Sequence, residues 1–215
     1  MPQTQASRPR LRGVSHLSMF PVAAGFAIPL AFVGKSDAAL VSAIVFGAAV
    51  TAMFAVSGFY HVITWRPAVR RWLARLDHAT VYGLIAATYT PFGLLVLSPG
   101  WAIPVLAIVW GGALLAILLK LLWVQAPKWL SAVIGLTLGW VGAVAFSQLL
   151  QLPAAAIALV IATGLFYTVG AVIYARRRPN PYPSVFGYHE LFHVLTIAAA
   201  ACEYVAVAFY VLPRA

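Results

Sequence analysis

The chain has 215 residues, of which 63% are hydrophobic and 8% are charged, and its formal net charge is +10. A water-soluble domain carries about a quarter charged residues, so this composition excludes a soluble protein and indicates a polytopic membrane protein. Nucleic acid is not expected as a partner, because the basic residues form short clusters between apolar runs. The single cysteine, Cys202, excludes an internal disulfide and a four-cysteine metal site.

The chain begins with a polar, arginine-containing segment, residues 1–13, which is predicted to be a cytoplasmic tail. Residues 14–215 are predicted to form a single membrane domain with seven apolar runs, each near the ~20 residues that a helix needs to cross the hydrocarbon core. The runs are roughly Leu17–Val33, Ala39–Ile63, Leu76–Leu97, Trp101–Trp123, Trp129–Leu150, Ala154–Tyr174 and Phe186–Leu212. Because backbone groups at that depth have no water to bond, we expect an all-α fold of seven transmembrane helices.

The distribution of basic residues predicts the orientation of these helices. Twelve of the fourteen lysines and arginines fall on one set of helix ends, and only Lys35 and Arg214 fall on the other. The positive-inside rule therefore places the amino terminus in the cytoplasm and the carboxyl terminus outside. We expect an integral protein of the plasma membrane, in a bacterium the inner membrane. The basic and aromatic segment Trp65–Arg75 is interpreted as a short helix in the headgroup layer.

This topology brings most of the rare polar residues into one membrane leaflet. His189 and His193 lie four residues apart at the start of the seventh run, on one helix face. Ser57 and His61 have the same spacing at the inner end of the second run, and Asp77 begins the third. Ionisable side chains in membrane helices are costly, and each one is a functional-site hypothesis.

Three imidazoles that leave one coordination position open are typical of a catalytic zinc site. His61, His189 and His193 are the candidate ligands. The alternative is a set of interfacial histidines that bind no metal. Asp77 could instead pair with Arg75 or cap the third helix. Ser57 could instead donate a hydrogen bond to a carbonyl of its own helix.

Three segments resemble the signature of the hemolysin III family, the bacterial branch of the superfamily of progestin and adipoQ receptors, to which alkaline ceramidases are more distantly related. They are Ser57-Gly-Phe-Tyr-His61, then Leu76-Asp77-His78-Ala-Thr-Val-Tyr82 continuing to Thr88-Tyr89-Thr90-Pro91, and His189-Glu-Leu-Phe-His193. The resemblance extends over about residues 12–213. It implies seven helices with an inside amino terminus, and Zn²⁺ bound by His61, His189 and His193.

The resemblance also implies that Asp77 holds a zinc-bound water and that Ser57 lies nearby. One departure concerns the segment before the first helix, where many relatives have acidic and asparagine residues. This chain has arginines and Val14-Ser15-His16 there, which leaves the role of His16 open.

The chemistry of these residues suggests zinc-assisted hydrolysis of a lipid amide or ester. Zinc lowers the pKa of a bound water and polarises a carbonyl, Asp77 would accept the proton, and Ser57 would donate a hydrogen bond to the developing oxyanion. A membrane lipid is the expected substrate, and no obligate protein partner is expected. Supporting contacts around the ligands are predicted for His78, Tyr60, Tyr82 and Glu190.

Two other functions remain open. His189-Glu190-x-x-His193 fits the H-E-x-x-H pattern of metalloproteases, in which the glutamate is the general base. The final helix, however, leaves no downstream sequence for a third ligand. Hemolysin III proteins are named for a cytolytic, pore-forming activity, so a non-enzymatic membrane protein or receptor-like regulator with a structural zinc is the second alternative.

Overall fold

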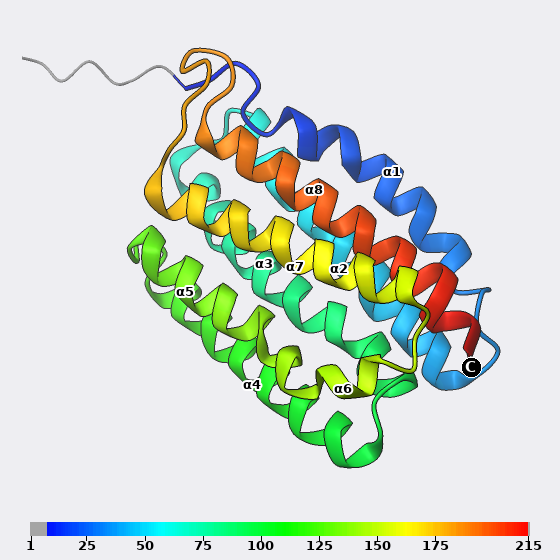
Figure 1. The fold of residues 1–215 in the computed structure, drawn as a ribbon. Helices are drawn as coiled ribbons and strands as arrows, with labels where there is room; N and C mark the ends of the chain where they lie inside the picture. The colour runs from blue at the N-terminus through cyan, green and yellow to red at the C-terminus, as the bar shows by residue number, and fades with distance from the viewer. Residues whose placement is uncertain (1–7, 215) are drawn as a thin grey trace, which may run out of the picture.

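Residues 8–214 are described by a computed structural model, and this part of the chain is helical apart from turns and one β-bridge, between Tyr182 and Phe186 (Figure 1). The α-helices are α1 (Val14–Leu30), α2 (Asp37–Val62), α3 (Pro67–Leu95), α4 (Pro99–Leu122), α5 (Lys128–Gly139), α6 (Phe146–Leu149), α7 (Ala154–Arg176) and α8 (Tyr188–Ala206). A 3₁₀ turn, Val141–Ala145, joins α5 to α6, and Val207–Val211 continues α8 as a π-helical turn.

The expectation of an all-α membrane protein is confirmed, and the seven predicted runs fit seven helical passes. Five passes are long and apolar enough to cross a membrane, namely α2, α4, Lys128–Leu149, α7 and Tyr188–Arg214, and α1 is a shorter apolar helix. The remaining pass, α3, carries arginines in its first turns. The segment Trp65–Arg75 is not a separate interfacial helix, because α3 runs without a break from Pro67.

Local sequence explains where the helices begin. The Ser36 hydroxyl accepts a hydrogen bond from the Ala39 amide at 3.2 Å and caps α2. Pro67 and Pro99 occupy the first turns of α3 and α4, where a missing amide hydrogen costs nothing.

The fifth pass is interrupted between Gly139 and Phe146, and a tyrosine from α3 satisfies the freed backbone groups. The Tyr89 hydroxyl donates to the Gly139 carbonyl at 2.6 Å and accepts from the Gly142 amide at 3.0 Å. Irregular backbone at membrane depth needs such partners, because lipid offers none.

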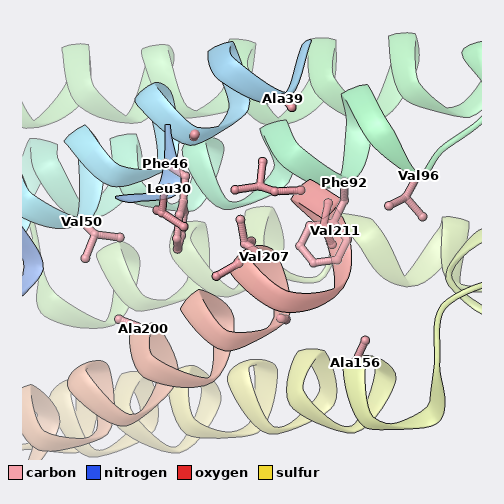
Figure 2. Packing of buried hydrophobic residues seen from close by; sticks show 14 of the residues in the cluster. Leu30, Ala39, Phe46, Val50, Phe92, Val96, Ala156, Ala200, Val207 and Val211 are labelled. Atoms are coloured by element: carbon pink, nitrogen blue, oxygen red, sulfur yellow. The ribbon is translucent and has the colours of Figure 1, made fainter. Parts of the chain in front are cut away.

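The helices form a bundle in which neighbours in the chain pack side by side and α8 returns between α1 and α7 (Figure 1). A core of buried apolar side chains fills the half of the bundle near the end of α8, where Leu30, Phe46, Phe92, Val207 and Val211 meet (Figure 2). Alanines such as Ala39 and Ala200 let the helices approach closely, which suits packing in a bilayer.

The predicted tail, residues 1–13, lies partly outside the described residues, since the description begins at residue 8. Residues 8–13 pair with the connection between α7 and α8. The amides of Arg10 and Leu11 donate to the carbonyls of Ser184 and Val185, at 3.0 and 3.1 Å. The segment therefore lies across the start of α8, next to the predicted histidines.

Candidate metal centre

The first turn of α8 is held in place by Glu190. The Glu190 carboxylate accepts a hydrogen bond from the Gly187 amide at 2.7 Å and forms an ion pair with Arg12, which precedes α1. This bond satisfies one of the amides that a helix start leaves free. His189 and His193 lie one turn apart on the helix that begins here.

His61, in the last turn of α2, completes a cluster of three buried imidazoles. One ligand atom from each of His61, His189 and His193 lies within 4.8 Å of the others. The Nε2 atoms of His61 and His189 are 3.2 Å apart, and the three residues are 7%, 8% and 1% exposed. Gly13 packs against His61, because a Cβ at Gly13 would lie 2.2 Å from the His61 Cβ.

The donor set of this cluster fits a zinc ion. Imidazole nitrogens bind Zn²⁺ at about 2 Å in a tetrahedral arrangement, which separates two ligating nitrogens by roughly 3.3 Å. The 3.2 Å between His61 and His189 matches that separation. The Nδ1 atoms of His189 and His193 are buried and have no hydrogen-bond partner, so the cluster is not explained by hydrogen bonds alone. The three residues could therefore hold a metal ion.

Asp77 lies beside the cluster, and Ser57 borders the same cavity as Asp77. The Asp77 Oδ2 atom is 3.5 Å from His61 Nε2 and 3.7 Å from His78 Nδ1. Asp77 and Ser57 are both buried, and both line the cavity that the histidines border. Within residues 8–214 the Ser42 hydroxyl bonds back to the Ala38 carbonyl of its own helix, whereas Ser57 makes no such bond. Its hydroxyl is thus available to a ligand in the cavity.

The residues predicted to support the ligands have different surroundings. His78 contacts the Asp77 carboxylate and not the imidazoles. The centres of the Tyr60 and His61 rings are 4.6 Å apart. The Arg70 guanidinium group lies over the Tyr60 ring, 5.2 Å from its centre. Tyr82 is buried and donates to the Ser131 carbonyl at 3.4 Å, so it ties α3 to α5. Glu190 is occupied by Arg12 and Gly187 and does not line the cavity.

His16 is the residue at this site whose role the sequence left open. Its ring stacks on that of His193, with centroids 3.7 Å apart and planes 9° from parallel. It is 2% exposed, and neither ring nitrogen has a hydrogen-bond partner. The stack restricts the orientation of the His193 ring. No local spacing pattern marks His16, because its partner is on another helix far along the chain.

A basic residue near His189 was also missed by sequence reasoning. The Lys128 ammonium donates to the Tyr188 hydroxyl at 2.6 Å and lies 4.8 Å from the centre of the Tyr174 ring. That ring is 5.8 Å from the ring of His189. Lys128 therefore places a positive charge at the start of α5, close to the cluster and attractive to an anionic group.

A cavity of about 310 Å³ extends from the histidines into the bundle. Its walls come chiefly from α3, α5, α7 and α8, and most of its lining side chains are apolar. His189, His193 and Asp77 border one part of it, and Glu203 borders another. A site with a few polar groups at one end of an apolar cavity suits an amphipathic ligand.

Comparisons with known proteins identify the family of this chain. A family described as "Haemolysin-III related" matches residues 4–204. The chain is 32% identical to Hemolysin-3 of Bacillus cereus over 180 residues, which cover 82% of this chain and 78% of that protein. It is 31% identical to the Hemolysin-3 homolog of Bacillus subtilis (strain 168) over 172 residues, which cover 80% and 78% of the two chains. The protein is therefore a member of the haemolysin III-related family of membrane proteins.

Proposed function

We propose that this protein is a zinc-binding hydrolase of the membrane that cleaves an amide or ester bond of a lipid and serves membrane homeostasis. The observation that carries the proposal is the cluster of His61, His189 and His193 beside the Asp77 carboxylate. His189, His193 and Asp77 border an apolar cavity. Neither a soluble substrate nor a purely structural metal requires such a cavity next to the ligands.

Each residue has a defined part in this reaction. Zn²⁺ held by the three histidines would supply Lewis acid chemistry, which polarises the substrate carbonyl. The Asp77 carboxylate accepts a proton from the attacking water and is oriented by His78. The Ser57 hydroxyl donates a hydrogen bond to the carbonyl oxygen as negative charge develops there. The cavity holds the hydrocarbon chain and excludes bulk water.

The proposal includes an orientation. With the amino terminus in the cytoplasm, the start of α3, the end of α2 and the start of α8 all lie at the cytoplasmic side of the plasma membrane. A lipid of the inner leaflet would then present its carbonyl groups at the level of the histidines while its chain stays within the bundle.

Hydrolysis can be tested with purified protein in vesicles that contain lipid amides and lipid esters, with mass spectrometry of the fatty acids released. Asp77→Asn keeps the size of the side chain and is expected to lower turnover by roughly 10²–10⁴-fold, because it removes the general base. Glu190→Gln is the matched control, and its turnover should stay within a few-fold of the wild type. Loss of turnover in Glu190→Gln alone would instead favour a metalloprotease-like use of Glu190.

A non-enzymatic role is the second candidate, because the cluster contains residues from two different helices. A metal ion at the three histidines would join α2 to α8, so it could serve to brace the bundle. The names of the two Bacillus relatives refer to haemolysis, but the mostly apolar cavity is a poor path for water and ions. Under the bracing hypothesis, His193→Ala lowers the thermal stability and leaves the amide and ester lipids of the cell unchanged.

A further inference from the structure

A carboxylate lies deep in the bundle, away from the histidines. Glu203 is on α8, ten residues after His193 and therefore about 15 Å further along the helix axis. It is 5% exposed, and no ion pair within residues 8–214 includes it. A carboxyl group at such a position in a membrane protein is costly and calls for a functional explanation.

Two hydroxyl groups from α7 accompany Glu203. The Thr163 hydroxyl lies 2.9 Å from the Leu159 carbonyl of its own helix and 3.3 Å from the Ala199 carbonyl of α8, one turn before Glu203. Tyr167 is one helical turn from Thr163, on the same face of α7. Its hydroxyl oxygen is buried and has no hydrogen-bond partner. Because α7 and α8 lie side by side (Figure 1), the three groups form a small polar cluster in an apolar region.

This cluster faces the cavity that begins at the histidines. Glu203, Thr163 and Tyr167 all line it, together with His193 and Asp77. A lipid whose carbonyl group lies at the histidines would therefore place the middle of its hydrocarbon chain beside Glu203. An unsubstituted chain would leave the Tyr167 hydroxyl without a partner, which is unfavourable in an apolar cavity.

We propose that Glu203, Thr163 and Tyr167 form a second binding site, which accepts a hydroxyl group carried on the hydrocarbon chain of a lipid in the cavity. A hydroxyl group both donates and accepts hydrogen bonds. It donates to the Glu203 carboxyl group and accepts from the Tyr167 hydroxyl, so the Tyr167 hydroxyl gains a partner. The inference rests on the proposed function only in assuming that a lipid occupies the cavity, and it requires no hydrolysis.

The test compares two fatty acids that differ chiefly by one hydroxyl group. Ricinoleate carries a hydroxyl in the middle of its chain, and oleate does not. Binding of each to the purified full-length protein in detergent is measured by displacement of a fluorescent fatty acid. The wild type should bind ricinoleate about 10-fold more tightly than oleate, because the added hydroxyl group gains buried hydrogen bonds.

Variants assign that preference to the cluster. In Glu203→Leu the affinity ratio should fall to about one, while oleate binds as well as before or better. Glu203→Gln and Tyr167→Phe keep the size of the side chains, and each should lower the ratio by roughly three-fold. Tyr204→Phe is the matched control for Tyr167→Phe, because Tyr204 is next to Glu203 but donates to the Phe26 carbonyl and does not line the cavity. Its ratio should equal that of the wild type.

Three outcomes would overturn the inference: equal affinities in the wild type, an unchanged ratio in both Glu203→Gln and Tyr167→Phe, or an equal loss in Tyr204→Phe. If Glu203→Leu fails to fold, the affinity ratios of Glu203→Gln and Tyr167→Phe test the inference, because these substitutions keep the size of the side chains. A hydroxyl preference without hydrolysis would defeat only the proposed enzyme, and hydrolysis without the preference would defeat only the second site.

Discussion

The two halves of this bundle are filled by different kinds of side chain. Near the end of α8, apart from Glu203, the interior consists mostly of apolar groups such as Phe46, Val207 and Val211, packed against one another (Figure 2). Near the start of α8, it holds His16, His61, His189 and His193, and several of their ring nitrogens have no partner. The same helices, α1, α2 and α8, supply both halves.

The apolar half stabilises the fold, whereas the half that contains the histidines forms the candidate site. Lipid is as apolar as the core, so close packing and not burial from water holds the apolar half together. Buried polar atoms without partners reduce stability, and native structures contain few of them. Their concentration in one half indicates that they are retained for a ligand. Substitutions in the two halves should therefore affect different properties.

The largest expected effect on stability is in the apolar half. Phe46 is fully buried, and Phe46→Ala should cost about 3–5 kcal/mol of unfolding free energy because it leaves a cavity. The folded fraction should keep its metal content. Unfolding in mixed micelles measures the change, and Phe32→Ala is the control, since Phe32 is 82% exposed. Equal losses from both variants would contradict the packing explanation.

A smaller effect is expected where α1 meets the histidines. Gly13 has a φ of 81°, which costs an alanine about 1–2 kcal/mol, and the new Cβ would collide with His61. Gly13→Ala should therefore lower both the stability and the metal affinity. Gly25→Ala is the control, because nothing lies within 4 Å of a Cβ there, and it should be neutral or stabilising by up to about 1 kcal/mol. Metal binding unchanged in Gly13→Ala would show that His61 is not held by this contact.

The ion pair at the start of α8 should contribute less. Arg12→Gln leaves the buried Glu190 carboxylate without its cation, but the Arg12 side chain is 18% exposed, so the expected loss is about 1–2 kcal/mol. Thermal unfolding measures it. The control is Arg10→Gln at an exposed position, which should have no measurable effect. A double variant with Glu190→Gln should be less destabilised than the sum of the single variants, and additive losses would exclude the pairing.

The smallest expected effect is at His16. His16→Leu removes the stacked ring from His193 and should weaken zinc binding by up to about 10-fold, as loss of a supporting group does. His16→Phe keeps an aromatic ring in the stack and should retain more of the affinity. Zinc titration with a competing chelator measures both. Complete loss of zinc in both variants would mean that His16 is itself a ligand.

Much of the fold was predictable from the sequence because each membrane pass is an apolar run. The predicted bounds of α2 and α7 lie within two residues of the observed ones, and the start of α7 at Ala154 is identical. The interruption of the fifth pass was not predictable, because it depends on Tyr89 of α3 bonding to Gly139 and Gly142. The continuity of α3 through its arginines was missed for a related reason. Arg70 and Arg75 pack over aromatic rings, contacts that composition does not reveal.

The candidate site was predictable where its residues have a spacing pattern. His189 and His193 are four residues apart, as are Ser57 and His61, and the predicted topology places both pairs at the same level. His16 and Lys128 have no such pattern. Each acquires its place only through contacts between helices that are distant in sequence, and the cavity that reaches Glu203 likewise depends on four helices at once.

The most direct measurement of the central claim is the metal content of purified protein, determined by mass spectrometry for the wild type and for His61→Ala, His189→Ala and His193→Ala. We predict about one zinc ion per chain in the wild type and little in each variant, with helical content retained, because three imidazoles form the site. Wild-type protein that takes up no zinc, or variants that all retain it, would contradict the account.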